Sequence, residues 1–212
     1  MSVERFLSHS TYGLMLLGCA AASLPAAAQQ KDSYPVRPIR LIVAYSSGGG
    51  NDIVARLIAP QLGAAFGQQV IIDNRAGAGG TLGTALVARA EPDGYTMLVS
   101  SLGTHAVAPN LFKNAGYDPV KDFAPVTLLA NTPIVLVVNK TLPEIDSVHA
   151  LIALAKAKPN TVRYASGGFG APPHAAAAVF ESMTGTRMQH VPYKGGGPAI
   201  VGLHAGETNV MF

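Results

Sequence analysis

The sequence predicts an α/β protein whose strands form open, mostly parallel sheets. Short apolar runs alternate with stretches of helical periodicity along most of the chain. Several runs are continuously apolar rather than alternating, which is typical of strands that helices cover on both faces. Glycine-rich segments stand between an apolar run and the next periodic stretch at three places. Such segments suit the strand-to-helix turns of an open α/β sheet.

The first half of the chain contains three predicted strands and two predicted helical segments. The near-continuous apolar run 39–45 is the first strand, and apolar residues then fall at helical spacing between 53 and 62. Pro60 lies inside this periodic stretch, where it removes a backbone donor and crowds the preceding turn. We therefore expect a kink there, or two short helices. The later elements are a strand over 69–73, a helix over 81–89 and a strand over 95–101.

A composition shift at 113–126, "KNAGYDPVKDFAPV", separates these elements from the second half. The chain ends at Phe212 inside an apolar run, without a polar tail. We interpret this ending as a missing C-terminal portion, and the alternative is a short strand that ends the fold. The predicted elements are strands over 126–130, 134–139, 162–166, 188–193 and 208–212, and helices over 148–157, 175–183 and 199–204.

Residues 1–28 are typical of a signal peptide. Arg5 precedes an apolar stretch over 12–24, and small residues follow up to Ala28, so we predict cleavage after Ala28. The stretch is too short to span a bilayer core of about 30 Å, which argues against a membrane anchor. Cys19 ends the segment "LLGC", which resembles a lipoprotein processing box; lipidation there is the less favoured alternative. Cleavage after Ala28 would leave no thiol for disulfides, catalysis or metal binding.

Composition excludes several classes of function. With 49% hydrophobic and 13% charged residues the chain is globular. The net charge of +3 comes from scattered Lys and Arg, and Trp is absent, so we predict no nucleic-acid partner. None of the six His residues stands at metal-ligand spacing from Cys, Asp or Glu, and no G-x-S-x-G motif occurs. We predict no catalytic residue, metal or cofactor, although a triad assembled from distant segments remains open.

Three glycine loops, 46–51, 166–173 and 194–198, each follow a predicted strand and precede a predicted helix. Ligands of open α/β sheets bind beyond the carboxyl ends of the strands, where helix N-termini attract anions. The phosphate-binding pattern GxxxxGK[ST] is absent, and "GAGGTLG" at 77–83 is one residue out of register with GxGxxG. Because no strong counter-charge accompanies the loops, they favour a carboxylate over a nucleotide.

Five segments together resemble the Bug family, the periplasmic substrate-binding proteins associated with tripartite tricarboxylate transporters. The resemblance implies a type II periplasmic-binding-protein fold, in which two lobes close on a small organic acid. It places lobe one at 29–128 and an incomplete lobe two at 129–212. It further implies a periplasmic, monomeric receptor that serves membrane transporter subunits or a sensor kinase. The segments are "YPVRPIRLIVAYSSGGGNDIVARLIAPQLG", "NRAGAGGTLGTALVARAEPDGYTMLV", "GYDPVKDFAPVTLLA", "YASGGFGAPPHAAAAVF" and "VPYKGGGPAI".

The resemblance also assigns ligand-binding positions. In the first loop, Ser46 and Ser47 replace the usual prolines, and Ala171 stands in the second loop where members often have Ser or Thr. The backbone of 48–51 and of 168–171 would cradle the carboxylate. The first-loop residues are Ser46, Ser47, Gly48, Gly49, Asn51 and Asp52; the second-loop residues are Ser166, Gly168, Phe169, Gly170, Ala171 and His174; and Ser101, Thr104 and Tyr193 complete the set.

Structural roles compete with ligand contact at several of these positions. Asp52 equally suits a helix cap, His174 suits the start of a helix, and Ser101 with Thr104 suits a plain turn. A carboxylate receptor is the function that we favour. The alternatives are an α/β enzyme that binds a phosphorylated cofactor at the first glycine loop, and a truncated chain that binds nothing.

Overall fold

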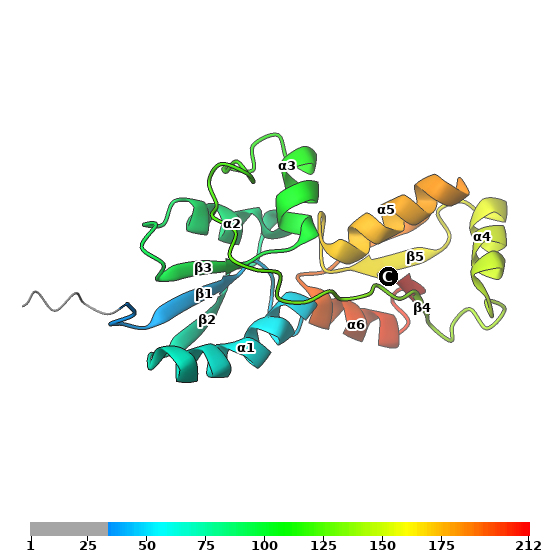
Figure 1. Cartoon of the computed structure of the whole chain (residues 1–212). Coiled ribbons are helices and arrows are strands. Elements are labelled where there is room, and N and C mark those ends of the chain that lie inside the picture. The colour runs from blue at the N-terminus through cyan, green and yellow to red at the C-terminus, as the bar shows by residue number, and fades with distance from the viewer. Residues whose placement is uncertain (1–33) are drawn as a thin grey trace, which may run out of the picture. The chain divides into compact units, whose positions relative to one another are not determined.

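The computed structural model describes residues 34–212, so the predicted cleavage after Ala28 and the lipidation at Cys19 lie outside the described residues. Helices and strands alternate from β1 onwards (Figure 1). The first half contains β1 (Ile39–Val43), α1 (Gly50–Phe66), β2 (Val70–Asn74), the 3₁₀ turn η1 (Ala78–Gly80), α2 (Thr81–Ala88), β3 (Thr96–Val99), the π-helical turn η2 (Gly103–Val107) and α3 (Ala108–Leu111). The second half contains β4 (Val137–Val138), α4 (Val148–Ala157), β5 (Arg163–Ser166), α5 (Pro172–Thr184), β6 (Gln189–Pro192), α6 (Gly196–His204) and β7 (Val210–Met211).

The strands form two sheets, which confirms the predicted α/β class. The first sheet has the order β2-β1-β3 and is entirely parallel. The second has the order β4-β7-β5-β6, in which only the β4–β7 pair is antiparallel. Val43 pairs with both Asn74 and Val99, and Ser166 pairs with Pro192. The loops that follow these strands therefore leave each sheet at one edge.

Each sheet has its own apolar core. In the first, Leu41, Val43 and Val99 pack with Ala55 of α1, because the continuous apolar runs of the strands face helices. In the second, Leu151 of α4 packs with residues of β5, α5 and β7. The buried members of this second cluster are Leu151, Ala155, Val162, Tyr164, Ala177, Met188 and Val210. These cores fix the strand ends from which the glycine loops project.

Helix α1 runs without interruption through Pro60, so the prediction of two short helices is wrong. Proline removes the bond that its own nitrogen would make to the carbonyl of Arg56, four residues earlier. Both residues are exposed, so water can satisfy that carbonyl. The buried faces of Ala55 and Ala59 keep the helix on the sheet across this position.

The predicted strand at 126–130 does not form, and that at 134–139 shrinks to Val137–Val138. A strand needs a neighbouring chain to receive its hydrogen bonds, and within residues 34–212 none pairs with 126–136. Val126 and Leu128 are accordingly 84% and 75% exposed. Figure 1 shows this stretch as a plain coil between α3 and β4. Among residues 34–212 no helix combines the length and hydropathy that crossing a bilayer requires.

Gly83 supports a prediction on the packing of α2. A Cβ built on Gly83 would lie 2.6 Å from the carbonyl oxygen of Arg75 and 2.9 Å from the Cα of Ala44. Alanine normally stabilises a helix interior by about 1 kcal/mol relative to glycine. Here the backbone must move, which costs about 1–3 kcal/mol, so Gly83→Ala should lower the free energy of unfolding in urea.

The control is Gly50→Ala, because a Cβ there would meet nothing within 4 Å. This variant should unfold within about 0.5 kcal/mol of the wild type, as surface substitutions usually do. A Gly83→Ala protein more stable than the wild type would contradict the backbone-on-backbone packing.

Candidate functional site

The glycine loops of the two sheets touch one another inside the compact unit Tyr34–Phe212. The hydroxyl of Ser46 donates to the carbonyl of Lys194, which joins the first loop to the third. A Cβ built on Gly79 would lie 2.3 Å from the carbonyl oxygen of Phe169, and one on Gly103 would lie 2.6 Å from that of Gly170. Only glycine allows these approaches, so the loops of the first sheet lie directly against the loop after β5.

Asp52 organises the first loop. It is 2% exposed and accepts hydrogen bonds from the N–H of Gly48 at 2.9 Å, from Asn74 Nδ2 at 3.0 Å and from Arg56 Nε at 2.9 Å. Burial alone would raise the pKa of Asp52, but the hydrogen bonds from Arg56, Gly48 and Asn74 and the charge of Arg56 outweigh it and hold that pKa below its ordinary value. The carboxylate is therefore ionised and fully engaged within the protein.

The side chains of the first loop are also engaged. Ser47 Oγ donates to Asn74 Oδ1 at 3.0 Å, and Asn74 Nδ2 donates to the carbonyl of Tyr45. The groups left to bind a ligand are backbone N–H groups. Gly50 and Asn51 lie in the first turn of α1, where N–H groups have no acceptor within the helix. Of the predicted backbone donors 48–51, the N–H of Gly48 is already bound to Asp52. The donors left for a ligand are those at the start of α1.

The second loop uses most of its donors internally. The N–H of Gly168 donates to Ser166 Oγ at 3.1 Å, that of Ala171 to the carbonyl of Gly168 at 3.2 Å, and that of Gly170 to His174 Nδ1 at 3.3 Å. Of the predicted backbone donors 168–171, only the N–H of Phe169 lacks an acceptor among residues 34–212. Its ring is 52% exposed and stands edge-on to His190, with the ring centroids 4.8 Å apart.

The other predicted residues are held by their own surroundings. Thr104 is fully buried, and its Oγ1 accepts from the N–H of Ser101 at 3.1 Å, which closes the turn after β3. The hydroxyl of Tyr193 donates to Glu207 Oε2 at 2.9 Å, so it is engaged beside α6. Ser166 is fully buried at the end of β5.

Three contributors were missed in the sequence: Asn74, Arg56 and His190. Asn74 ends a parallel strand at the edge where ligands bind, a signal that was available. Arg56 stands four residues after Asp52 on α1, a spacing that predicts a salt bridge. His190 lies inside β6, where no motif distinguishes it from an ordinary strand residue.

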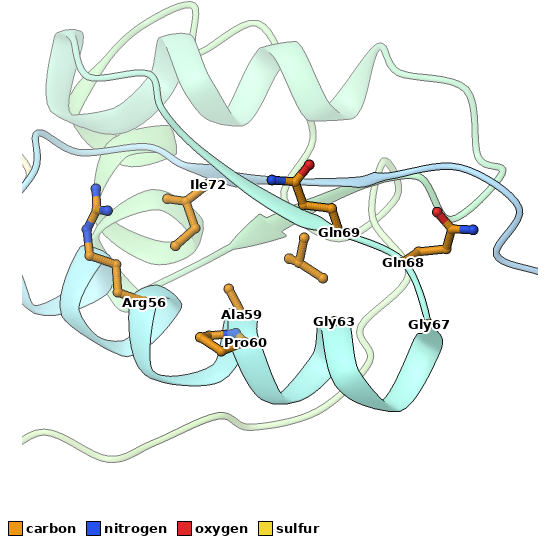
Figure 2. A pocket seen from close by; sticks show the side chains of 9 residues that line it. Arg56, Ala59, Pro60, Gly63, Gly67, Gln68, Gln69 and Ile72 are labelled. Atoms are coloured by element: carbon orange, nitrogen blue, oxygen red, sulfur yellow. The ribbon is translucent and has the colours of Figure 1, made fainter.

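The described residues include two hollows. A groove of about 580 Å³ runs between α1 and β2 and includes Arg56, Pro60, Gly63 and Gln68 (Figure 2). A second, of about 340 Å³, lies between η2, α3 and α5; its lining is Val107, Asn110, Leu111, His174, Ala175 and Ala178. Among residues 34–212 no three His, Cys, Asp or Glu side chains are grouped to hold a metal ion.

The site can hold an anion through neutral donors. The N-terminus of α1 carries partial positive charge and unpaired N–H groups. Arg56, the cation beside it, is neutralised by Asp52. Two carboxylate oxygens match such donors well, whereas a polyphosphate usually needs added cations.

The chain is similar to known proteins over most of its length. The family described as "Tripartite tricarboxylate transporter family receptor" matches residues 54–212. Protein BugT of Bordetella pertussis is 42% identical over 85% of this chain and 56% of its own length, and a protein from Agrobacterium vitis is 39% identical over 90% and 54%. The chain thus spans little more than half the length of these relatives.

Solved structures show the same fold. The R. palustris protein Rpa4515 with adipate has a TM-score of 0.80 at 38% identity, and MatC from Rhodopseudomonas palustris with bound malate has 0.79 at 36%; the match covers 84% of this chain and 59% and 60% of theirs. The periplasmic binding protein BugD has 0.74 at 32% identity, over 84% of this chain and 59% of its own. The predicted periplasmic-binding-protein fold and the resemblance to the Bug family are confirmed: this chain belongs to the family of tripartite tricarboxylate transporter receptors.

Proposed function

We propose that this protein is a periplasmic receptor that captures a small dicarboxylate or related organic acid. One observation carries the proposal: glycine loops from two sheets meet beside the start of α1, where backbone N–H groups lack an acceptor among residues 34–212 and Arg56 is neutralised by Asp52. Relatives of the same fold hold adipate and malate. Export by residues 1–28, with cleavage after Ala28, belongs to the same proposal.

The two loops contribute unequally to the grip on the ligand. Helix α5 begins with Pro172 and Pro173, which have no N–H to offer. Helix α1 begins with Gly50 and Asn51, which do. A ligand carboxylate therefore docks on the start of α1, and the N–H of Phe169 adds a donor from the other sheet.

Binding makes and breaks no covalent bond, so the protein works as a carrier and not as an enzyme. A hinge motion between the two halves of the protein would separate these touching loops to admit the acid and close them around it. The loaded protein would then deliver its ligand, as a monomer, to a membrane transporter or to a sensor kinase.

A thermal-shift screen tests this function. A ligand that binds only the folded state adds about 2.7 kcal/mol of stability at a hundredfold excess over its Kd. Malate, adipate and related acids should raise Tm, whereas ATP and NAD should not. A shift with nucleotides would favour an enzyme that binds a phosphorylated cofactor, and no shift with any acid would favour a chain that binds nothing.

A further inference from the structure

Two histidines contact the second glycine loop, residues 166–173. His190 of β6 and His174 of α5 have ring centroids 4.5 Å apart, and His190 stacks on Tyr164 at 4.7 Å. Both rings reach the loop: His190 Nε2 lies 2.6 Å from Ser166 Oγ, and His174 Nδ1 accepts from the N–H of Gly170. The histidine pair, His174 and His190, thus contacts the loop at its first residue and near its end.

The hydrogen bonds around Ser166 select one form of His190. Ser166 Oγ lies 3.1 Å from both the N–H and the carbonyl oxygen of Gly168, and its hydroxyl has one proton to give. If Ser166 donated to His190, the ring proton would sit on Nδ1, which is buried and has no partner among residues 34–212. The carbonyl of Gly168 would also lose its donor.

With the proton on Nε2, the network is complete. His190 donates to Ser166, Ser166 donates to the carbonyl of Gly168, and the N–H of Gly168 donates back to Ser166. Only a lone pair on Nδ1 lacks a partner, which costs less than a buried N–H without an acceptor. Neutral His190 with Nε2–H is therefore the form that this geometry stabilises.

We propose that His190 is a positioning residue for ligand capture: through Ser166 it fixes the backbone of Gly168 and leaves the N–H of Phe169 as the free donor of the second loop. The inference rests on the proposed function, since it concerns the loop that would contact the carboxylate. His174 supports the same loop from its other end through Gly170.

The surroundings keep the histidine pair neutral at pH 7. Burial and the neighbouring His174 lower the pKa of His190 to about 4. Burial also lowers the pKa of His174, against Glu181, which raises it. Tyr164 faces His190 from β5, and the residues of η2 and α3 that line the hollow beside His174 are uncharged: Val107, Asn110 and Leu111.

Protonation would place an N–H on buried Nδ1 and a charge beside His174. The loop should therefore be ordered at neutral pH and lose its order as the pH falls through about 4. A role in packing alone would not make the order of the loop depend on the protonation of this ring.

Two variants of His190 separate these roles. His190→Leu removes the donor, and His190→Gln keeps an N–H near the position of Nε2. His190→Leu leaves Ser166 without its buried partner, so this variant should bind malate or adipate about tenfold or more weakly by calorimetry, which corresponds to about 1.4 kcal/mol or more. His190→Gln should recover most of the affinity, and His149→Gln, on an exposed position of α4, is the matched control. The ionisation of the ligand also changes affinity with pH. Comparing the affinities of the wild type and of His190→Gln at the same pH removes this contribution.

An NMR measurement without ligand gives an independent readout. Ring ¹⁵N spectra of the wild type should show the proton of neutral His190 on Nε2. The midpoint of the pH titration of this ring should lie near its pKa of about 4. The amide signal of Gly168 should shift in His190→Leu and return in His190→Gln. An Nδ1–H ring, or an unmoved Gly168 amide in the Leu variant, would overturn the inference.

The two proposals fail in different ways. If the wild type binds these acids and His190→Leu binds them equally well, the positioning role of His190 is wrong, but the receptor function is supported. If the wild type binds none of them, the receptor function falls, and the Gly168 amide still decides whether His190 positions the loop.

Discussion

Asp52→Ala should destabilise the protein by about 2–4 kcal/mol and weaken the proposed binding of malate or adipate at least tenfold. The carboxylate is 2% exposed and accepts three hydrogen bonds, from Gly48, Asn74 and Arg56. Removing one partner of a buried charge pair costs about 3–5 kcal/mol, and the exposed Arg56 recovers part of that loss in water. The loop that would cradle the ligand loses its anchor at Gly48. Urea unfolding measures the first effect and calorimetry the second.

Asp93→Ala is the matched control for this substitution. Asp93 also pairs with an arginine, Arg37, but their side chains are 39% and 60% exposed. Exposed ion pairs contribute about 0–1 kcal/mol, so this variant should unfold and bind almost as the wild type does. Equal losses in both variants would contradict a special role for Asp52.

The contribution of Asp52 should depend on pH in a defined direction. Its pKa lies below the ordinary value of 3.8 in the folded protein. The stabilisation is therefore complete above about pH 4 and is lost as the pH falls through the lowered pKa. The difference in Tm between the wild type and Asp52→Asn should shrink over that acidic range and stay constant from pH 5 to 7.

Local patterns were enough to predict most of the fold. The apolar runs of the strands and the glycines after them specify buried parallel strands, whatever the rest of the chain does. The error at 126–130 shows the limit: its apolar pattern is that of a strand, but a strand exists only where a neighbour pairs with it. Pro60 shows another limit, because the packed face of α1 outweighs one missing hydrogen bond.

The sequence was enough to predict that glycine loops form the candidate site, but not which of their N–H groups are free to bind a ligand. The sequence predicts that the loops 46–51, 166–173 and 194–198 gather at the carboxyl ends of the strands. It does not single out the segment around Gly79, which lies against Phe169. It does not show that Asn74 binds Asp52 from 22 positions away, or that His190 binds Ser166 from 24 positions away. Those side chains decide which N–H groups are already used, so the number of free donors emerges only from the tertiary structure.

Gly79→Ala should weaken binding of malate or adipate about as strongly as Asp52→Ala. Gly79 has φ of +66°, and a Cβ there would lie 2.3 Å from the carbonyl oxygen of Phe169. The left-handed backbone costs a non-glycine residue about 1–2 kcal/mol, and separating the two loops costs about 1–3 kcal/mol more. If the loops meet only when the receptor closes, the second cost falls on binding and weakens affinity about tenfold or more. Calorimetry with malate or adipate measures it.

Alanine at Gly185 and alanine at Gly67 are controls that separate the cost of the left-handed backbone from the cost of the steric contact between the loops. They have φ of +67° and +65°, close to that of Gly79, but a Cβ on either would meet nothing within 4 Å. Alanine at these positions should lower Tm through backbone strain and leave affinity unchanged. Because the strain is matched, any additional loss in Gly79→Ala comes from the contacts of its Cβ with the carbonyl group of Phe169 and with the ring of Phe112, whose Cε2 would lie 2.9 Å away. A loss seen only in unfolding would mean that the loops touch permanently, and a loss seen in binding would mean that their contact forms as the ligand is enclosed.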